Sequence, residues 1–148
     1  MLQAVFDTNI IVSAAIKKEG IPALLLALFF EDKITLFTSS ILLTEYEQVL
    51  KRPKFGFGHQ EVDNLINQIK EKAIIIEPIQ EITQIKDIPD NRVLECASCA
   101  KVSYIVTGNK HHFTFKQFKG TKIVNPREFF IAFLAEGRTT GTRPRKQN

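Results

Sequence analysis

The stretch LQAVFDTNIIVSA, residues 2–14, decides the fold that the sequence predicts. Residues 2–6 are a short apolar run that predicts a buried strand, and Asp7 comes directly after it. Residues 9–16 predict a helix. A buried strand that leads straight into a helix is typical of α/β proteins, in which helices cover a sheet.

The same alternation continues along the chain. Residues 61–72 predict the clearest helix, because apolar residues recur there at the spacing of one helix face. The further predicted strands are residues 34–37, 73–76, 103–107 and 122–124, and the further predicted helices are residues 21–30, 41–50, 90–101 and 126–135. Short strands that are apolar on both faces and separated by helices indicate a parallel sheet. The predicted fold class is therefore α/β, a doubly wound parallel sheet sandwiched between helices in three layers.

Length and charge indicate one domain with a basic tail. The 148 residues give room for one sizeable core, which we expect to span residues 1–136. Residues 137–148 contain no apolar residue and predict a disordered tail. The basic residues of this tail account for the whole net charge of +4, and they are Arg138, Arg143, Arg145 and Lys146. A nearly neutral body with a basic tail is weaker evidence for a nucleic-acid partner than a basic groove would be.

The cysteines and the apolar runs exclude several classes of protein. Cys96 and Cys99 have no second pair to complete a zinc site, and we expect both to be small buried core residues. The longest apolar run, residues 23–30, is too short to cross a membrane, which needs about 20 residues. The sequence begins without a basic leader, and the expected location is cytoplasmic.

Three acids lie where a binding site is expected. Asp7 closes the first strand, and ligands of open α/β sheets bind beyond the carboxyl ends of strands. Glu45 and Asp90 lie on helix faces that should be buried. Their apolar neighbours are Ile41, Leu42 and Val49 for Glu45, and Val93, Leu94 and Ala97 for Asp90. Glu47 and Glu95 have more polar neighbours and are weaker candidates.

Three inward-facing acids without an obvious basic partner suggest a shared cation. Buried carboxylates are costly unless they are neutralised, paired or bound to a metal. Oxygen ligands select hard ions, so Mg²⁺ or Mn²⁺ is the expected occupant. Each acid also has a purely structural explanation. Asp7 and Asp90 could cap helices, and Glu45 could reach solvent at the rim of the core.

Five blocks, in order from residue 1 to about residue 134, carry a family resemblance: VFDTNIIVSA, LLTEYEQVLKRPKF, PDNRVLECA, YIVTGNKHHF and IVNPREFF. Together they resemble the PIN-domain toxins of toxin–antitoxin systems, relatives of the VapC ribonucleases. The resemblance implies a metal-dependent endoribonuclease that hydrolyses phosphodiester bonds in single-stranded RNA. It also implies a homodimer and an antitoxin protein as a partner.

The resemblance carries over to individual residues. The catalytic, metal-binding acids of the family match Asp7, Glu45 and Asp90, and the supporting polar positions match Asn9 and Thr107. Many PIN domains have a fourth acid at the position that Asn109 occupies here. An asparagine keeps one carbonyl ligand but removes the negative charge. The alternative function is therefore a catalytically weak or silent PIN module that binds RNA or a protein partner.

An RNA substrate would require cations near these acids. Arg92, which follows Asp90 closely, is the best candidate, together with Lys110 and Arg52, whereas Lys51 and Lys54 are expected to be solvated.

Aromatic and apolar side chains suggest further contacts. Phe55 and Phe57 could stack on bases or anchor their loop, and His111 and His112 could contact phosphate, although a solvated pair in a turn is favoured. The helix of residues 21–30 has few polar positions, so a second copy, an antitoxin or the core itself should cover it.

A phosphatase that uses Asp7 as its nucleophile is the remaining rival. Enzymes of the haloacid-dehalogenase type require a second aspartate two positions later, where this chain has Asn9. This rival is therefore disfavoured.

Overall fold

The structure, a computed structural model, describes residues 1–79, 88–109 and 117–142, and of residues 88–90 and 138–142 it describes the backbone alone. The strands are β1 (Gln3–Phe6), β2 (Thr35–Thr38), β3 (Ile74–Ile75), β4 (Tyr104–Val106), β5 (Gln117–Phe118) and β6 (Thr121–Val124). The helices are α1 (Thr8–Ile16), α2 (Ile21–Phe30), α3 (Ser40–Leu50), the 3₁₀ turn η1 (Pro53–Phe55), α4 (His59–Lys72), α5 (Ile88–Ala100) and α6 (Pro126–Thr142).

Within the described residues the strands form one sheet, in the order β3-β2-β1-β4-β6-β5. Strand β1 pairs in parallel with β2 on one side and with β4 on the other. The chain builds outward from β1 to β3 and then returns to β4, so the strand order reverses between β1 and β4. Such a reversal is where ligands of open α/β sheets bind.

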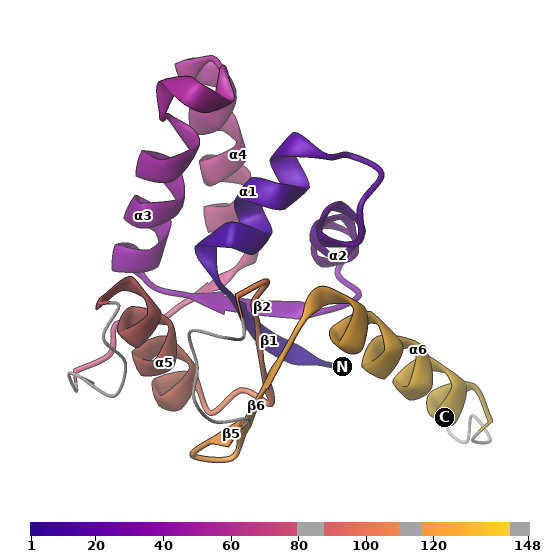
Figure 1. Cartoon of the computed structure of the whole chain (residues 1–148). Helices are drawn as coiled ribbons and strands as arrows, with labels where there is room; N and C mark the ends of the chain where they lie inside the picture. Colours follow the sequence, from indigo (N-terminus) through magenta and orange to yellow (C-terminus); the bar gives the residue numbers. More distant parts are fainter. Residues whose placement is uncertain (80–87, 110–116, 143–148) are drawn as a thin grey trace.

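Helices cover both faces of this sheet, as the sequence predicts. Consecutive side chains of a strand point to opposite faces, and Ala4, Val5 and Phe6 of β1 are all fully buried. Figure 1 shows α1, α2 and α6 on one side of the strands and α5 on the other. On the α6 side, the ring of Phe129 meets those of Phe6 and Tyr104 edge-on, at centroid distances of 6.2 and 5.4 Å.

Local hydrogen bonds explain where the helices that frame the site begin. Ser39 caps α3, because its hydroxyl accepts a hydrogen bond from the Leu42 N–H at 3.3 Å. Asn125 and Glu128 each accept from the other's backbone N–H at 2.8 Å, which is a capping box at the start of α6. The Tyr46 hydroxyl of α3 donates to the Phe6 carbonyl of β1 at 2.5 Å. This bond fixes α3 beside the carboxyl end of the central strand.

Four details differ from the prediction. Strand β5 was not predicted, and it runs antiparallel to β6 at one edge of an otherwise parallel sheet. Helix α6 continues past residue 135 to Thr142, which takes in the first half of the expected tail; residues 143–148 lie outside the described residues. Cys99 is exposed, whereas Cys96 is buried as predicted. Ile41, expected on the buried face of α3, is 54% exposed.

None of the helices in the described part of the chain is long and apolar enough to span a membrane.

Candidate active site

Asp7 lies at the point where the strand order reverses, directly after β1. Its side chain is only 4% exposed. The carboxylate accepts hydrogen bonds from the Thr8 N–H (2.7 Å), the Asn9 side-chain amide (3.0 Å) and the Thr107 hydroxyl (2.7 Å). Asp7 is also the N-cap of α1, so its structural explanation holds as well. Donors from two strand ends therefore fix one buried carboxylate at the carboxyl edge of the sheet.

The segment after β4 is tied to the same carboxylate. The Asn9 side-chain oxygen accepts from the Gly108 N–H at 2.9 Å, and the Thr107 hydroxyl oxygen accepts from the Asn109 N–H at 3.0 Å. A Cβ at Gly108 would lie 3.3 Å from that Asn9 oxygen, so the close approach of the two segments favours glycine. The half-buried Asn109 is thus held near Asp7 by bonds that run through Asn9 and Thr107.

Glu45 comes to this site from α3. It is half-buried, and the Thr8 hydroxyl donates a hydrogen bond to its carboxylate at 2.5 Å. Because the Thr8 N–H bonds Asp7, a single residue connects the two acids. The exposed Ile41 shows that one reason for placing Glu45 on a buried face was wrong, although Leu42 is buried as expected. Sequence reasoning missed Thr8, whose only local signal is its position between Asp7 and Asn9.

The remaining predicted residues are only partly described. The structure places Asp90 in the first turn of α5 without describing its side chain, and Lys110, His111 and His112 lie outside the described residues. No group of three or more His, Cys, Asp or Glu side chains gathers among those that the structure describes. The structure therefore brings together Asp7 and Glu45, and the role of Asp90 stays a prediction.

Helix α5 contributes an ion pair that the sequence reading undervalued. Glu95 is only 9% exposed, and its carboxylate lies 2.6 Å from the guanidinium of Arg92, whose side chain is 16% exposed. Glu95, which its polar neighbours made a weaker candidate for the site, is therefore buried and paired. The i, i+3 spacing of opposite charges was the signal that could have indicated the pair.

Among the other candidate cations, Arg52 is exposed after α3. Lys51 pairs with Asp63 at 2.8 Å and with Glu47 at 2.9 Å, and these hydrogen bonds raise the pKa of its amine. Lys51 therefore connects α3 to α4.

The two loop phenylalanines behave as anchors in this structure. The rings of Phe55 and Phe57 stack at 6.3 Å with 24° between their planes, and both pack against the core while remaining half-buried.

The chemistry of the described donors fits a hard cation. The acids Asp7 and Glu45 and the side-chain amide of Asn109 present oxygen ligands, which Mg²⁺ and Mn²⁺ prefer over sulfur. A buried carboxylate with a second acid close by also calls for positive charge. The residues present therefore fit the metal that the sequence predicts.

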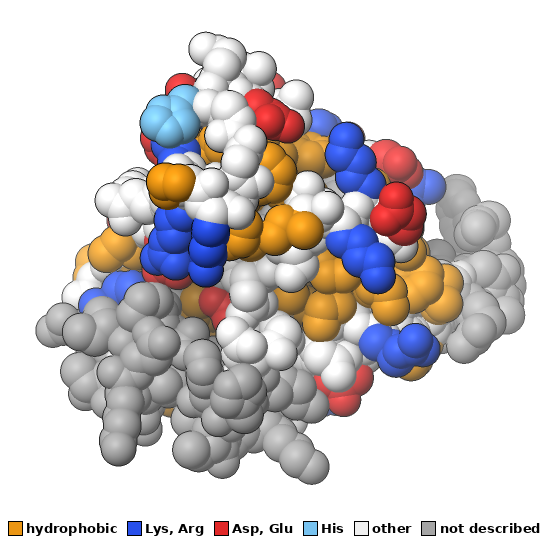
Figure 2. Space-filling view, turned by 45° about the horizontal axis from the view of Figure 1, so that its top comes forward, with side chains coloured by type: hydrophobic (Ala, Val, Ile, Leu, Met, Phe, Trp, Pro, Cys, Tyr) orange, Lys and Arg blue, Asp and Glu red, His pale blue; other side chains and the backbone are white. Residues whose placement is uncertain are grey.

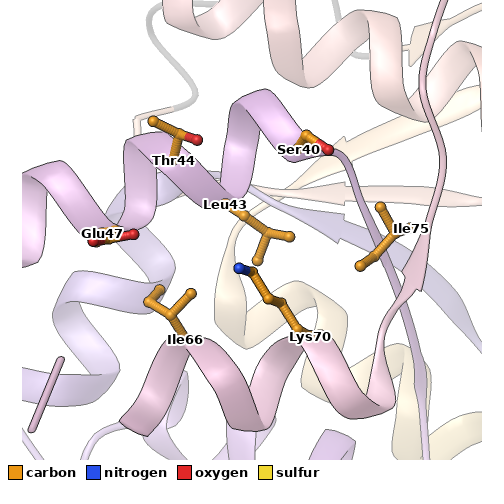
Figure 3. A pocket seen from close by; sticks show the side chains of 7 residues that line it. All are labelled: Ser40, Leu43, Thr44, Glu47, Ile66, Lys70 and Ile75. Carbon is orange, nitrogen blue, oxygen red and sulfur yellow. The ribbon is translucent and has the colours of Figure 1, made fainter. Parts of the chain in front are cut away.

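Two pockets lie away from these acids. One, of about 250 Å³, is mainly apolar and is formed where α1, α2, α3 and α4 approach each other. Its charged lining residues are Lys18 and Glu61. Its apolar lining includes Ala15, Leu26, Leu50, Phe57, Val62 and Leu65. The other, of about 170 Å³, lies between α3 and α4. Figure 3 shows Leu43 of α3 and Lys70 of α4 pointing toward each other between the two helices.

Comparisons with known proteins agree with the family resemblance that the sequence carries. A family model described as PIN domain matches residues 3–111. Over 143 residues the chain is 30% identical to an uncharacterized protein of Methanocaldococcus jannaschii, MJ1680, covering 89% of this chain and 92% of that protein. The fold is similar to the crystal structure of VapBC2 from Rickettsia felis bound to a DNA fragment from their promoter. That match has a TM-score of 0.58 and 19% identity, and it covers 84% of this chain and 98% of the other.

Proposed function

The chain belongs to the PIN domain family, and from that premise we propose that it is a metal-dependent endoribonuclease that hydrolyses phosphodiester bonds in single-stranded RNA. PIN domains are typically nucleases and generally depend on metal ions. The observation that carries the proposal is the buried Asp7 carboxylate, fixed by hydrogen bonds beside Glu45 at the reversal of the strand order.

The proposed metal ligands are Asp7, Glu45 and Asp90, with the Asn109 carbonyl where many relatives have a fourth acid. A bound Mg²⁺ or Mn²⁺ supplies Lewis acidity and lowers the pKa of bound water. Asn9 and Thr107 orient Asp7 through the hydrogen bonds described above.

The RNA backbone would be held by cations around these acids. Arg52 is exposed, and Arg92 is oriented by Glu95. We propose that these two arginines, with Lys110, contact the phosphates.

Cleavage of an unstructured RNA in Mg²⁺ or Mn²⁺ tests the proposal. We expect Asp7→Asn to lower the rate by about a hundredfold or more, because even residues that merely support metal ligands contribute about 10- to 100-fold. EDTA should abolish cleavage. Asp32→Asn is the matched control, since Asp32 is exposed and pairs with Lys72 far from the site. Cleavage that survives both Asp7→Asn and EDTA would rule out the mechanism.

A silent binding module is the second candidate, and Asn109 favours it. A site with fewer charged ligands holds a divalent cation less firmly. If this candidate is correct, the wild-type chain binds RNA without cutting it, and Asn109→Asp creates or strongly increases cleavage. The same assay therefore separates the two functions.

We further propose that the chain is a toxin whose antitoxin places an apolar side chain in the pocket beside Phe57. The pocket is mainly apolar and open to solvent between four helices, and Lys18 offers a cation to an acidic neighbour of the inserted side chain. The fold is similar to that of the VapBC2 structure, in which the proteins are bound to a DNA fragment from their promoter.

A labelled synthetic peptide, helical and apolar on one face with acidic flanks, tests this partner site by fluorescence anisotropy. Ala15→Trp fills the pocket. It should weaken peptide binding at least about tenfold, because the peptide can then bury one apolar side chain fewer. Ala23→Trp on α2, outside the pocket lining, is the control. Equal binding by both variants, or no binding by the wild-type chain, contradicts the assignment.

A further inference from the structure

Thr8 contacts both described acids of the site. It is the first residue of α1 and is only 6% exposed. Its backbone N–H donates to Asp7 at 2.7 Å, and its hydroxyl donates to Glu45 at 2.5 Å. The two carboxylates come from elements that are far apart in the sequence, and Thr8 is bonded to both.

The surroundings of Thr8 fix the direction of its hydroxyl. A threonine in a helix has a restricted χ1 angle, and burial restricts it further. Helix α1 packs directly against α3, so the hydroxyl of one helix reaches the carboxylate of the other. Glu45 has a long side chain with several rotatable bonds on a half-buried helix face, and the bond from Thr8 restrains one of its carboxylate oxygens.

Electrostatics favours the same arrangement. Two carboxylates in a partly buried site repel each other, and each is stabilised by hydrogen bonds to its charged form. Thr8 provides one such donor to each carboxylate, and hydrogen bonds to ionised acceptors are the stronger ones. Its backbone donor is at the N-terminus of α1, where the helix dipole adds positive potential.

We propose that Thr8 is a positioning residue that sets the place of the Glu45 carboxylate relative to Asp7 before a cation binds. The role of the cation rests on the proposed function. The position of Glu45 does not, and it can be measured without any metal.

Three variants separate the hydroxyl from the rest of the side chain. Thr8→Val keeps the shape and the backbone N–H but removes the hydroxyl, whereas Thr8→Ser keeps the hydroxyl. Thr121→Val is the matched control. Thr121 is equally buried, and its hydroxyl donates to the Val102 carbonyl at 2.7 Å at the opposite edge of the sheet. If the valine variant does not fold, Thr8→Ala also removes the hydroxyl, and alanine favours the helix.

The experiment combines calorimetric titration of the full chain with Mn²⁺ alone and crystal structures of the metal-free proteins. Thr8→Val should bind Mn²⁺ about 10- to 100-fold more weakly, as expected for a residue that orients a ligand. Thr8→Ser and Thr121→Val should keep most of the wild-type affinity. In the metal-free crystals, Glu45 should move away from Asp7 in Thr8→Val and stay in place in Thr8→Ser.

The outcomes distinguish this proposal from the proposed function. An unmoved Glu45 in Thr8→Val, or an equal loss of Mn²⁺ affinity in Thr8→Val and Thr121→Val, overturns the role of Thr8. If the wild-type chain binds no Mn²⁺, the proposed function fails. Displacement of Glu45 in the metal-free Thr8→Val crystal would then still support Thr8 as the positioning residue.

Discussion

At the scale of single residues, Asp7 combines two roles that a sequence presents as alternatives. It caps α1 and is also the best-fixed acid of the candidate site. The roles are compatible because the cap bond occupies one carboxylate oxygen, while Asn9 and Thr107 bond the other. A helix N-terminus also stabilises a negative charge beside it. The cap therefore holds the proposed metal ligand in place, and the structural explanation does not weaken the functional one.

Cys96 gives a pH dependence that can be worked out from its position. Burial raises the pKa of its thiol from 9.0 to about 12. Above pH 9.0 the unfolded chain loses this proton while the folded chain keeps it. The free energy of unfolding therefore falls as the pH rises from 9.0 towards 12.

We predict that raising the pH from 8 to 10 lowers the stability of the wild type by about 1.4 kcal/mol more than that of Cys96→Ala. The reason is that each pH unit above the pKa of the unfolded thiol contributes about 1.4 kcal/mol. Urea unfolding at the two pH values measures the difference. Cys99 is exposed in the same helix, so Cys99→Ala should lose as much stability between pH 8 and pH 10 as the wild type does. Identical pH profiles of the wild type and Cys96→Ala would show that Cys96 is not buried as described.

At the scale of elements, the sequence predicts helices with local signals best. Helix α2 has its predicted bounds, and α4, predicted over residues 61–72, begins at His59 and ends at Lys72 as predicted. Strand β5 was missed because its two residues carry no apolar alternation, and their pairing with β6 is a tertiary contact. Helix α6 was ended too early because Gly137 and the polar residues after it resemble a helix stop.

The site divides in the same way between local and tertiary information. Asp7 was predictable because a strand end in an α/β fold faces the ligand edge. Thr8 was not, because its role depends on α1 packing against α3, which no local pattern encodes. The burial of Glu95 was missed for a similar reason, since it depends on how the folded chain packs around α5. Sequence therefore indicated Asp7, Glu45 and the supporting residues Asn9 and Thr107, and it missed Thr8, which connects the two acids.

At the scale of the whole molecule, an apolar surface is left over α2 and α6. Leu24 of α2 and Ile131 and Leu134 of α6 are exposed at 40%, 55% and 43%. The two helices pack against each other, and Figure 2 shows hydrophobic side chains gathered on the right of the molecule, over these helices. The expectation that α2 would need covering on its outer face is thus met only in part by α6. Contiguous exposed apolar area on a soluble protein marks an interaction surface.

We propose that a second copy of the chain covers this face, and a pair of matched substitutions tests it. Ile131 and Ile41 are almost equally exposed, at 55% and 54%, and both lie in helices, but only Ile131 lies on the α2–α6 face. Ile131→Glu should convert a dimer to a monomer in light scattering, because a twofold interface buries the new charge twice. Ile41→Glu should leave the dimer intact, and neither exposed substitution should lower the unfolding free energy of the monomer by more than about 0.5 kcal/mol. A wild-type chain that is monomeric at high concentration, or an equal effect of both substitutions, would rule out this face as the interface between two copies.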